Sequence, residues 1–255
     1  MIKRLLAPVL GFTAFLALWE AFVRVFEVRK FILRPPSTAM RHLWNFRDDF
    51  LAAASITSGH AALGLVIGLT VSLLLGAALS ANRFAEWAAQ PVLTLVQVVP
   101  WVAYVSSVVL WLDGGNKPVL FMVALGCTPA FVFATIDGMR GADPATIELL
   151  ASVDAGRWEV LRRVRLPSAA PALFTASRFN IGFSLAIAFY VEGSNFSNEG
   201  IGSIGRRAAS QASSADALWA AVFAMAILGF LGLMALSLLE RTVLRWHVSQ
   251  RSQPG

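Results

Sequence analysis

The residues best suited to chemistry in this chain gather in one charged connection, residues 145–171. Between two long apolar stretches it places seven charged side chains: Glu148, Asp154, Arg157, Glu159, Arg162, Arg163 and Arg165. That much charge cannot lie in hydrocarbon, so the connection must stand in water or against another protein. Its apolar residues recur at roughly helical spacing, which predicts short amphipathic helices that break at Ala155-Gly156 and end at Leu166-Pro167. This pattern favours docking of a partner through charged and apolar contacts, and an ordinary interfacial loop is the alternative interpretation.

The remaining sequence offers no catalytic constellation. It has no Gly-x-x-x-x-Gly-Lys phosphate loop, so the chain is not expected to hydrolyse ATP, and no Ser-His-Asp set stands out. The single Cys127 excludes an intramolecular disulfide and a multi-cysteine metal site, and the three scattered histidines offer no ligand spacing. We therefore expect neither enzyme activity nor a cofactor or metal in this chain.

The elements that hold the charged connection must lie in a membrane. Of the 255 residues, 57% are hydrophobic and only 14% are charged, whereas a soluble domain carries about a quarter charged residues. The net charge of +6 is interpreted as membrane-surface charge, because no basic patch alternates with stacking aromatic residues as in nucleic-acid-binding proteins. The first apolar segment follows basic residues, as in a signal peptide, but its length and its Trp19-Glu20 pair favour a retained span.

Six segments are long enough to cross a bilayer, which needs about 20 residues each. They are residues 5–25, 60–81, 91–112, 118–137, 171–191 and 216–239. The chain is thus predicted to be one all-α transmembrane domain over residues 1–255, with the loop 138–170 in the cytoplasm and a disordered tail at 246–255. With six spans both termini are cytoplasmic, and a slight excess of Lys and Arg on that side agrees.

Local signals refine this plan. Ser37, after two prolines, is predicted to be the N-cap of an amphipathic helix that continues to Phe50. Gly64 and Gly68 permit close contact with another helix, although glycine is also simply commoner in membrane helices. Pro100 lies in the middle of the third segment and is expected to bend it.

The charged connection resembles the signature of the permease subunits of bacterial ATP-binding-cassette importers. That signature runs Glu-Ala-Ala, three residues, Gly, then a hydrophobic and basic stretch that closes on Leu-Pro. Glu148 stands at the glutamate position and Leu166-Pro167 at the closing pair, with the family's spacing. The stretch Leu33–Ser37 and the position of Pro100 are similar to the sulfonate, taurine and nitrate branch of the family.

Two departures from the signature bear on shape. Leu149-Leu150 replaces the alanine pair, and Asp154 stands where the signature has glycine, with Gly156 two residues on. The turn requires a positive φ at the position of the signature glycine, and aspartate adopts a positive φ more readily than most residues. We expect the turn either to survive on Asp154 or to move onto Gly156.

The resemblance implies the six-helix fold of type I importer permeases, with a cytoplasmic coupling helix between the fourth and fifth spans. It implies that this helix docks on an ATPase subunit through Glu148, Ala151, Asp154, Ala155, Gly156, Arg157, Trp158, Leu166 and Pro167. The implied partners are two ATPase copies that bind the ATP, an extracytoplasmic solute-binding protein, a second permease copy and membrane lipid, but no nucleic acid. The implied location is the bacterial plasma (inner) membrane.

The path of the solute is indicated by polar or helix-bending residues in or near the spans: Gln97, Pro100, Tyr104, Arg178, Asn180 and Glu192. Arg178 either lines a path for small anions, the cargo that the resemblance implies, or extends to the membrane surface. Glu192 either contacts a docked binding protein or caps the rim. An ion-coupled secondary transporter is the alternative function, but it would want a buried acidic group near the centre of a span, and none of the six has one.

Overall fold

The computed structural model describes residues 2–29, 32–195, 199–211 and 214–244, with side chains from residue 6 onward, and every regular element within them is helical. The predicted tail at 246–255 lies outside the described residues. The first half of the chain forms α1 (Ile2–Val25), α2 (Pro36–Asn45), α3 (Arg47–Ser80), α4 (Arg83–Val98), the 3-10 turn η1 (Trp101–Ala103) and α5 (Val105–Trp111). The second half forms α6 (Asn116–Arg140), α7 (Pro144–Ser152), α8 (Arg157–Val160), the π turn η2 (Leu161–Arg165), α9 (Leu166–Ser194), α10 (Gly200–Ala209) and α11 (Ala215–Val243). The all-α class is therefore confirmed.

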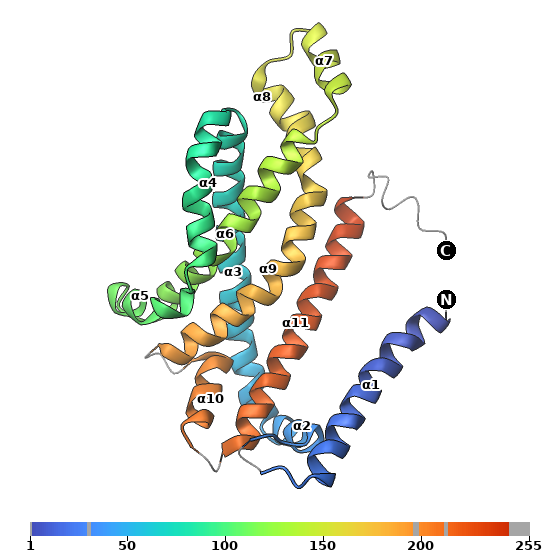
Figure 1. The fold of residues 1–255 in the computed structure, drawn as a ribbon, viewed down its shortest axis with the longest axis vertical. Coiled ribbons are helices and arrows are strands. Elements are labelled where there is room, and N and C mark those ends of the chain that lie inside the picture. The colour runs from blue at the N-terminus through green and yellow to red at the C-terminus, as the bar shows by residue number, and fades with distance from the viewer. Residues whose placement is uncertain (1, 30–31, 196–198, 212–213, 245–255) are drawn as a thin grey trace.

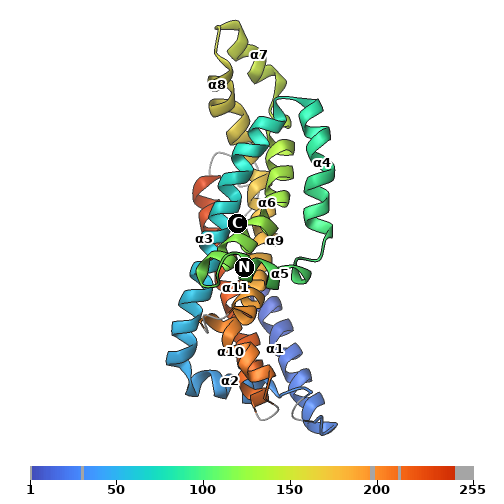
Figure 2. The same ribbon diagram turned by 90° about the vertical axis from the view of Figure 1, so that its left-hand side faces the viewer.

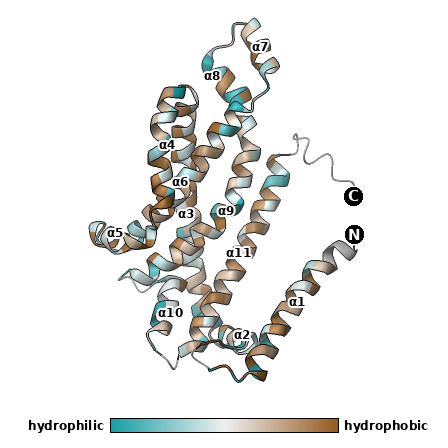
Figure 3. Ribbon diagram, viewed as in Figure 1, coloured by the Kyte–Doolittle hydropathy of each residue, from teal (hydrophilic) through white to brown (hydrophobic). Residues whose placement is uncertain are grey.

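Five helical runs in the described part of the chain are long and apolar enough to cross a membrane. They are Leu6–Val25, Arg47–Ser80, Asn116–Arg140, Arg157–Ser194 and Ala215–Val243. Each contains or largely overlaps one predicted span, and Figure 3 shows the hydrophobic colour along these helices and hydrophilic patches around α8 and α10.

The predicted third span, residues 91–112, is not a single helix. The chain leaves α4 at Val98, passes through η1 and re-enters a helix only in α5. Val99 is extended, with ψ at 123°, because proline disfavours helical geometry in the residue before it. Pro100 therefore breaks the segment outright instead of bending it.

The core is built around α6, which packs along its whole length between α3 and α9. Met122, Cys127 and Phe131 of α6 are fully buried there. Gly64 and Gly68 of α3 face this helix so closely that an added methyl group would come within 2.6 Å of the Val123 side chain and 3.0 Å of the Ala124 carbonyl oxygen, respectively. The two glycines thus do bring α3 and α6 together, as their spacing predicted.

The prediction that Ser37 is the N-cap of the amphipathic helix is wrong. The N-cap is Pro35, two residues earlier, and helix α2 begins at Pro36, whose ring fixes a helical φ at a position that needs no amide hydrogen. Ser37 lies inside the helix, where its amide and hydroxyl both donate to the Glu20 carboxylate of α1, at 3.0 and 2.7 Å. The amphipathic segment also divides at Phe46, so that Phe50 belongs to α3.

The molecule is elongated, with different elements at its two ends. The hairpin of α7 and α8 projects beyond the helices at one end, and α2 and α10 lie at the other (Figures 1 and 2). The first turn of α1 and the last turn of α11 are the ends of these helices that point toward the hairpin end of the molecule (Figure 1). We call these the hairpin end and the α10 end.

Candidate functional site

The N-terminus of helix α7 in the hairpin is capped by Asp143, the residue that directly precedes it. The Asp143 carboxylate accepts hydrogen bonds from the Thr146 hydroxyl at 2.7 Å and from the Ala145 amide at 3.1 Å. The Thr146 and Ala145 hydrogen bonds hold the pKa of Asp143 below its usual value, because they stabilise the charged form. Pro144 occupies the first helical turn, where its missing amide hydrogen costs nothing.

The turn between α7 and α8 survives on Asp154. This residue has φ at +57°, in the left-handed region, while Gly156 has φ at −67° and becomes the N-cap of α8. The amides of Asp154 and Ala155 donate to the carbonyls of Ala151 and Leu150, at 3.1 and 3.0 Å, and close the helix. The turn therefore keeps the geometry that the signature glycine would provide, and it has not moved onto Gly156.

The tip of the hairpin presents an apolar surface to its surroundings. Leu149, Val153 and Trp158 are each about two-thirds exposed, at 67, 68 and 69%. Of these three only Trp158 was a predicted contact residue. The other predicted contact residues on the tip are exposed beside it, except the half-buried Ala155: Glu148, Ala151, Asp154, Gly156 and Arg157. An exposed apolar cluster with charged neighbours is the pattern of a protein-docking surface.

The predicted helix end at Leu166-Pro167 is wrong. The chain continues without a break from α8 through η2 into α9, so the helical run extends from Arg157 to Ser194. The amide of Leu166 donates to the carbonyl of Leu161, five residues back, which is the wider spacing of a π turn. This local widening lets the helix accept the Pro167 ring without ending.

The residues predicted for the solute path do not come together. Gln97 and Pro100 are exposed at the break after α4, Tyr104 is half-buried, and Asn180 is fully buried, where its side-chain amide donates to the carbonyl of Cys127 at 3.3 Å. Arg178 of α9 is exposed and forms an ion pair with Glu240 of α11.

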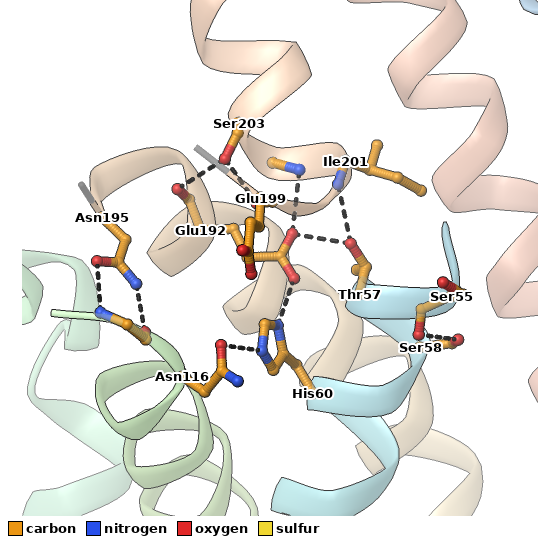
Figure 4. A network of polar contacts seen from close by, with 12 residues as sticks. Ser55, Thr57, Ser58, His60, Asn116, Glu192, Asn195, Glu199, Ile201 and Ser203 are labelled. Atoms are coloured by element: carbon orange, nitrogen blue, oxygen red, sulfur yellow. Dashed lines mark hydrogen bonds and ion pairs between the residues drawn. The ribbon is translucent and has the colours of Figure 1, made fainter. Parts of the chain in front are cut away.

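Glu192 is buried, with 1% of its surface exposed, and lies at the centre of a polar network at the α10 end of α9 (Figure 4). Its carboxylate accepts from the Thr57 hydroxyl at 2.8 Å and from the Gly202 amide at 3.1 Å, and it pairs with His60 Nδ1 at 2.8 Å. The other ring nitrogen of His60 faces the Asn116 side-chain oxygen at 3.1 Å. Glu192 is thus a structural tie between α3, α9 and α10, and His60 extends the network to Asn116 of α6.

Sequence reasoning missed the partners of Glu192. Thr57 and His60 stand three residues apart, which places both on one face of α3. That spacing, at the start of the predicted span 60–81, was the available signal, because polar groups that become buried need a hydrogen-bond partner. Across the described residues, no three side chains of His, Cys, Asp or Glu gather as metal ligands would.

A groove of about 530 Å³ opens between η1, α9 and α11, and sequence reasoning did not identify it. Its wall includes Trp101, Phe189 and Tyr190, and the rings of Trp101 and Tyr190 pack edge to face with centroids 5.4 Å apart. Gly182, Ala186 and Tyr190 form its α9 side, at successive turns of one exposed helix face. Most of this lining is apolar or aromatic.

The comparison with protein families gives a match over most of the chain. Residues 64–245 match the model of the binding-protein-dependent transport system inner membrane component. The match includes α6, the hairpin, α9, α10 and α11.

Individual proteins agree with this family. The chain is 26% identical to the formylaminopyrimidine transport permease protein ThiX of Halalkalibacterium halodurans, over 96% of this chain and 97% of that one. It is 25% identical to the putative aliphatic sulfonates transport permease protein SsuC of Bacillus subtilis, over 97% of this chain and 88% of that one. Its fold is similar to that of a chain in a bacterial ABC transporter involved in the import of alginate, with a TM-score of 0.63, 14% identity, and coverage of 94% of this chain and 95% of that one. These relatives are named as transport permeases and not as enzymes.

Proposed function

Because the chain belongs to the family of binding-protein-dependent transport system inner membrane components, we propose that it forms the translocation path of an ATP-driven importer for a small anionic solute. The proposed cargo class is a sulfonate, taurine, nitrate or a similar anion, and it is supported by the similarity to an aliphatic sulfonates transport permease. Two permease copies, two cytoplasmic ATPase subunits and an extracytoplasmic solute-binding protein make up the proposed assembly.

The observation that carries the coupling role is the shape of the hairpin. It combines a capped helix, a closed turn and an exposed apolar tip, and it continues without a break into the long helix α9. A short helix that inserts into a groove of the ATPase can pass on a movement, whereas a flexible tether cannot. In this proposal the hairpin lies in the cytoplasm with both termini on its side, and the α10 end faces the binding protein.

Co-purification tests this proposal. We expect the tagged chain, solubilised from its native membrane, to bring down an ATPase subunit. Replacement of Ala155-Gly156 by Glu-Glu places two bulky charges in the turn and should abolish that association while membrane insertion is retained. The matched control replaces Ser210-Gln211, two exposed residues at the α10 end, by the same pair and should leave the association intact.

Two results would contradict the proposal. Unchanged co-purification of the turn variant would move the ATPase contact to another surface. Transport that persists after ATP depletion, with a proton gradient intact, would instead support an ion-coupled carrier.

A further inference from the structure

The first turn of α10 is capped by side chains from two other helices. Glu199, the residue before α10, provides no side-chain cap. The amide of Ile201 instead donates to the Thr57 hydroxyl of α3 at 2.9 Å. The amide of Gly202 donates to the Glu192 carboxylate of α9 at 3.1 Å. Amides in the first turn of a helix have no partner within the helix, so α10 loses both hydrogen bonds if it separates from α3 and α9.

The ring of His60 has a hydrogen-bond acceptor at each of its two nitrogens (Figure 4). Nδ1 lies 2.8 Å from a carboxylate oxygen of Glu192, and Nε2 lies 3.1 Å from the side-chain oxygen of Asn116. A neutral imidazole has only one N–H donor, whereas the imidazolium ion has two. The arrangement therefore fits a doubly protonated His60, whose positive charge faces the carboxylate.

This positive charge balances a carboxylate that is closed to water. A buried ionised carboxylate is strongly destabilising unless it has a counter-charge and hydrogen-bond donors. The charged groups that act on the ring are Glu192 of α9, in direct contact, and Glu199 before α10, at longer range, while α6 contributes the uncharged Asn116. Loss of one proton from His60 would leave Glu192 without its counter-charge.

The Asn116 side of the ring lies next to water. Asn116 is exposed at the first position of α6, whereas Thr57 and Glu192, on the opposite side of the ring, are buried. Nε2 is therefore one side chain away from solvent. A proton can leave or reach this nitrogen without passing through the buried part of the network.

We propose that His60 and Glu192 form a proton-operated latch for α10. While His60 carries both ring protons, the pair holds the first turn of α10 against α3 and α9. When the pH rises and His60 loses one proton, the buried carboxylate loses its counter-charge and the α10 end loosens. Protonation of Glu192 at low pH breaks the pair from the other side, so the latch is tightest between the two titrations.

The latch depends neither on the cargo nor on the ATPase. In the proposed importer the α10 end faces the binding protein, so the latch would make that end respond to the external pH. Only this last consequence rests on the proposed function.

Amide hydrogen exchange in α10 measures the latch. With the full chain in lipid nanodiscs, the protection of the Ile201 and Gly202 amides is compared at about pH 6 and about pH 9, after correction for the intrinsic exchange rate. This range extends beyond the usual titration of histidine, near pH 6.5 with a spread of about one unit. Protection in the wild type should fall at least roughly tenfold, the effect of losing one hydrogen bond to a charged group.

Two histidine variants place the response in the structure. His60→Gln keeps a side-chain amide donor for Glu192 but carries no charge. Its α10 protection at about pH 6 should be at least roughly tenfold below that of the wild type and should not change toward pH 9. His42 of α2 lies at the same end and packs against the rings of Phe46 and Phe50. His42→Gln is therefore the matched control and should keep the wild-type response.

Nitrogen-15 NMR of histidine-labelled protein gives a second readout that needs no His60 variant. The other histidines of the chain are His42 and His247, so His42→Gln and His247→Gln identify the His60 signals by elimination. At about pH 6 both ring nitrogens of His60 should be protonated. One of them should lose its proton over the range in which α10 protection falls.

Three results would overturn the latch: a neutral His60 ring at about pH 6, wild-type protection of α10 that does not change with pH, or a fall in protection that persists in His60→Gln. His60→Gln should still bring down the ATPase in the co-purification assay. A failure of the latch is therefore distinguishable from a failure of the import function.

Discussion

Loss of the Glu192 carboxylate should be among the most damaging single changes outside the apolar core. Glu192 is 1% exposed and binds Thr57, His60 and Gly202. In Glu192→Ala these three groups lose their common acceptor in a site closed to water. A buried donor left without its acceptor costs about 1–3 kcal/mol, so three such donors predict a loss of at least about 3 kcal/mol in the free energy of unfolding.

Glu192→Gln separates the contribution of the charge from that of the hydrogen-bond acceptor. Glu192→Gln keeps the volume of the side chain and one acceptor oxygen but removes the charge. A hydrogen bond to a charged group contributes about 1.5–3 kcal/mol and one to a neutral group about 0.5–1.5 kcal/mol, so Glu192→Gln should cost roughly 1–3 kcal/mol. His60→Ala combined with Glu192→Ala should cost less than the sum of the two single changes, because the two residues are in contact.

Equilibrium unfolding with increasing sodium dodecyl sulfate in mixed micelles, followed by tryptophan fluorescence, measures these losses. Glu148→Ala, which removes an exposed glutamate from the hairpin, is the control and should unfold as the wild type does. A loss below about 1 kcal/mol for Glu192→Ala, or additive losses in the double variant, would refute the view that this pair holds the α10 end together.

Three further changes test other parts of the fold. Asp154→Gly should retain the ATPase in co-purification, whereas Asp154→Val should lose most of it, because a β-branched residue does not adopt φ at +57° without strain. Gly76→Leu should lower the midpoint of thermal unfolding, since an added methyl group already lies 2.6 Å from the Thr135 side chain between α3 and α6; a midpoint equal to the wild type would contradict this packing. Asp143→Ala should accelerate amide hydrogen exchange at Ala145 at neutral pH, because it removes the carboxylate that caps α7. In the wild type this cap is present above the lowered pKa of Asp143 and is lost as the pH falls through that pKa. Protection of the Ala145 amide that persists in the variant would exclude the cap.

Hydrophobic length and glycine spacing were enough to predict most of the fold. The long apolar runs became helices because a backbone in lipid must satisfy its own hydrogen bonds. A close helix contact at Gly64 and Gly68 was predictable, since no side chain at these positions holds the helices apart, but only the fold identifies α6 as the partner.

The effect of each proline was not predictable from the sequence alone. Pro129 lies inside α6, which is covered on both sides, and the helix stays intact. Pro100 follows α4, which is largely exposed, and there the chain breaks. Exposure alone does not decide the outcome, because Pro91 lies inside the same largely exposed α4 and the helix stays intact there. The sequence does not distinguish Pro91 from Pro100, so the break could be located only from the fold.

The site was predictable only where its residues are near one another in the chain. The turn on Asp154 lies within one connection, so its position relative to Glu148 and Gly156 carried the information. Glu192 and His60 are 132 positions apart, and only the fold shows that they meet. The groove lined by Trp101, Gly182 and Gly229 likewise joins η1, α9 and α11, three elements distant in sequence.

Helix α9 connects the hairpin to the Glu192 network. With α8 and η2 it forms one helical run of 38 residues, a length of about 57 Å at the rise of an α-helix. The run begins at the hairpin, passes Arg178 and the groove at Gly182, and ends at the Glu192 network. The network ties its far end to α3, α6 and α10, so a force applied at the hairpin acts on a helix that is held at the opposite end. In the proposed importer, such a helix would transmit a movement of the hairpin by tilting or rotating about its held end. Coupling in that proposal would need no contact between the hairpin and the solute, but it would need α9 to stay rigid along its length.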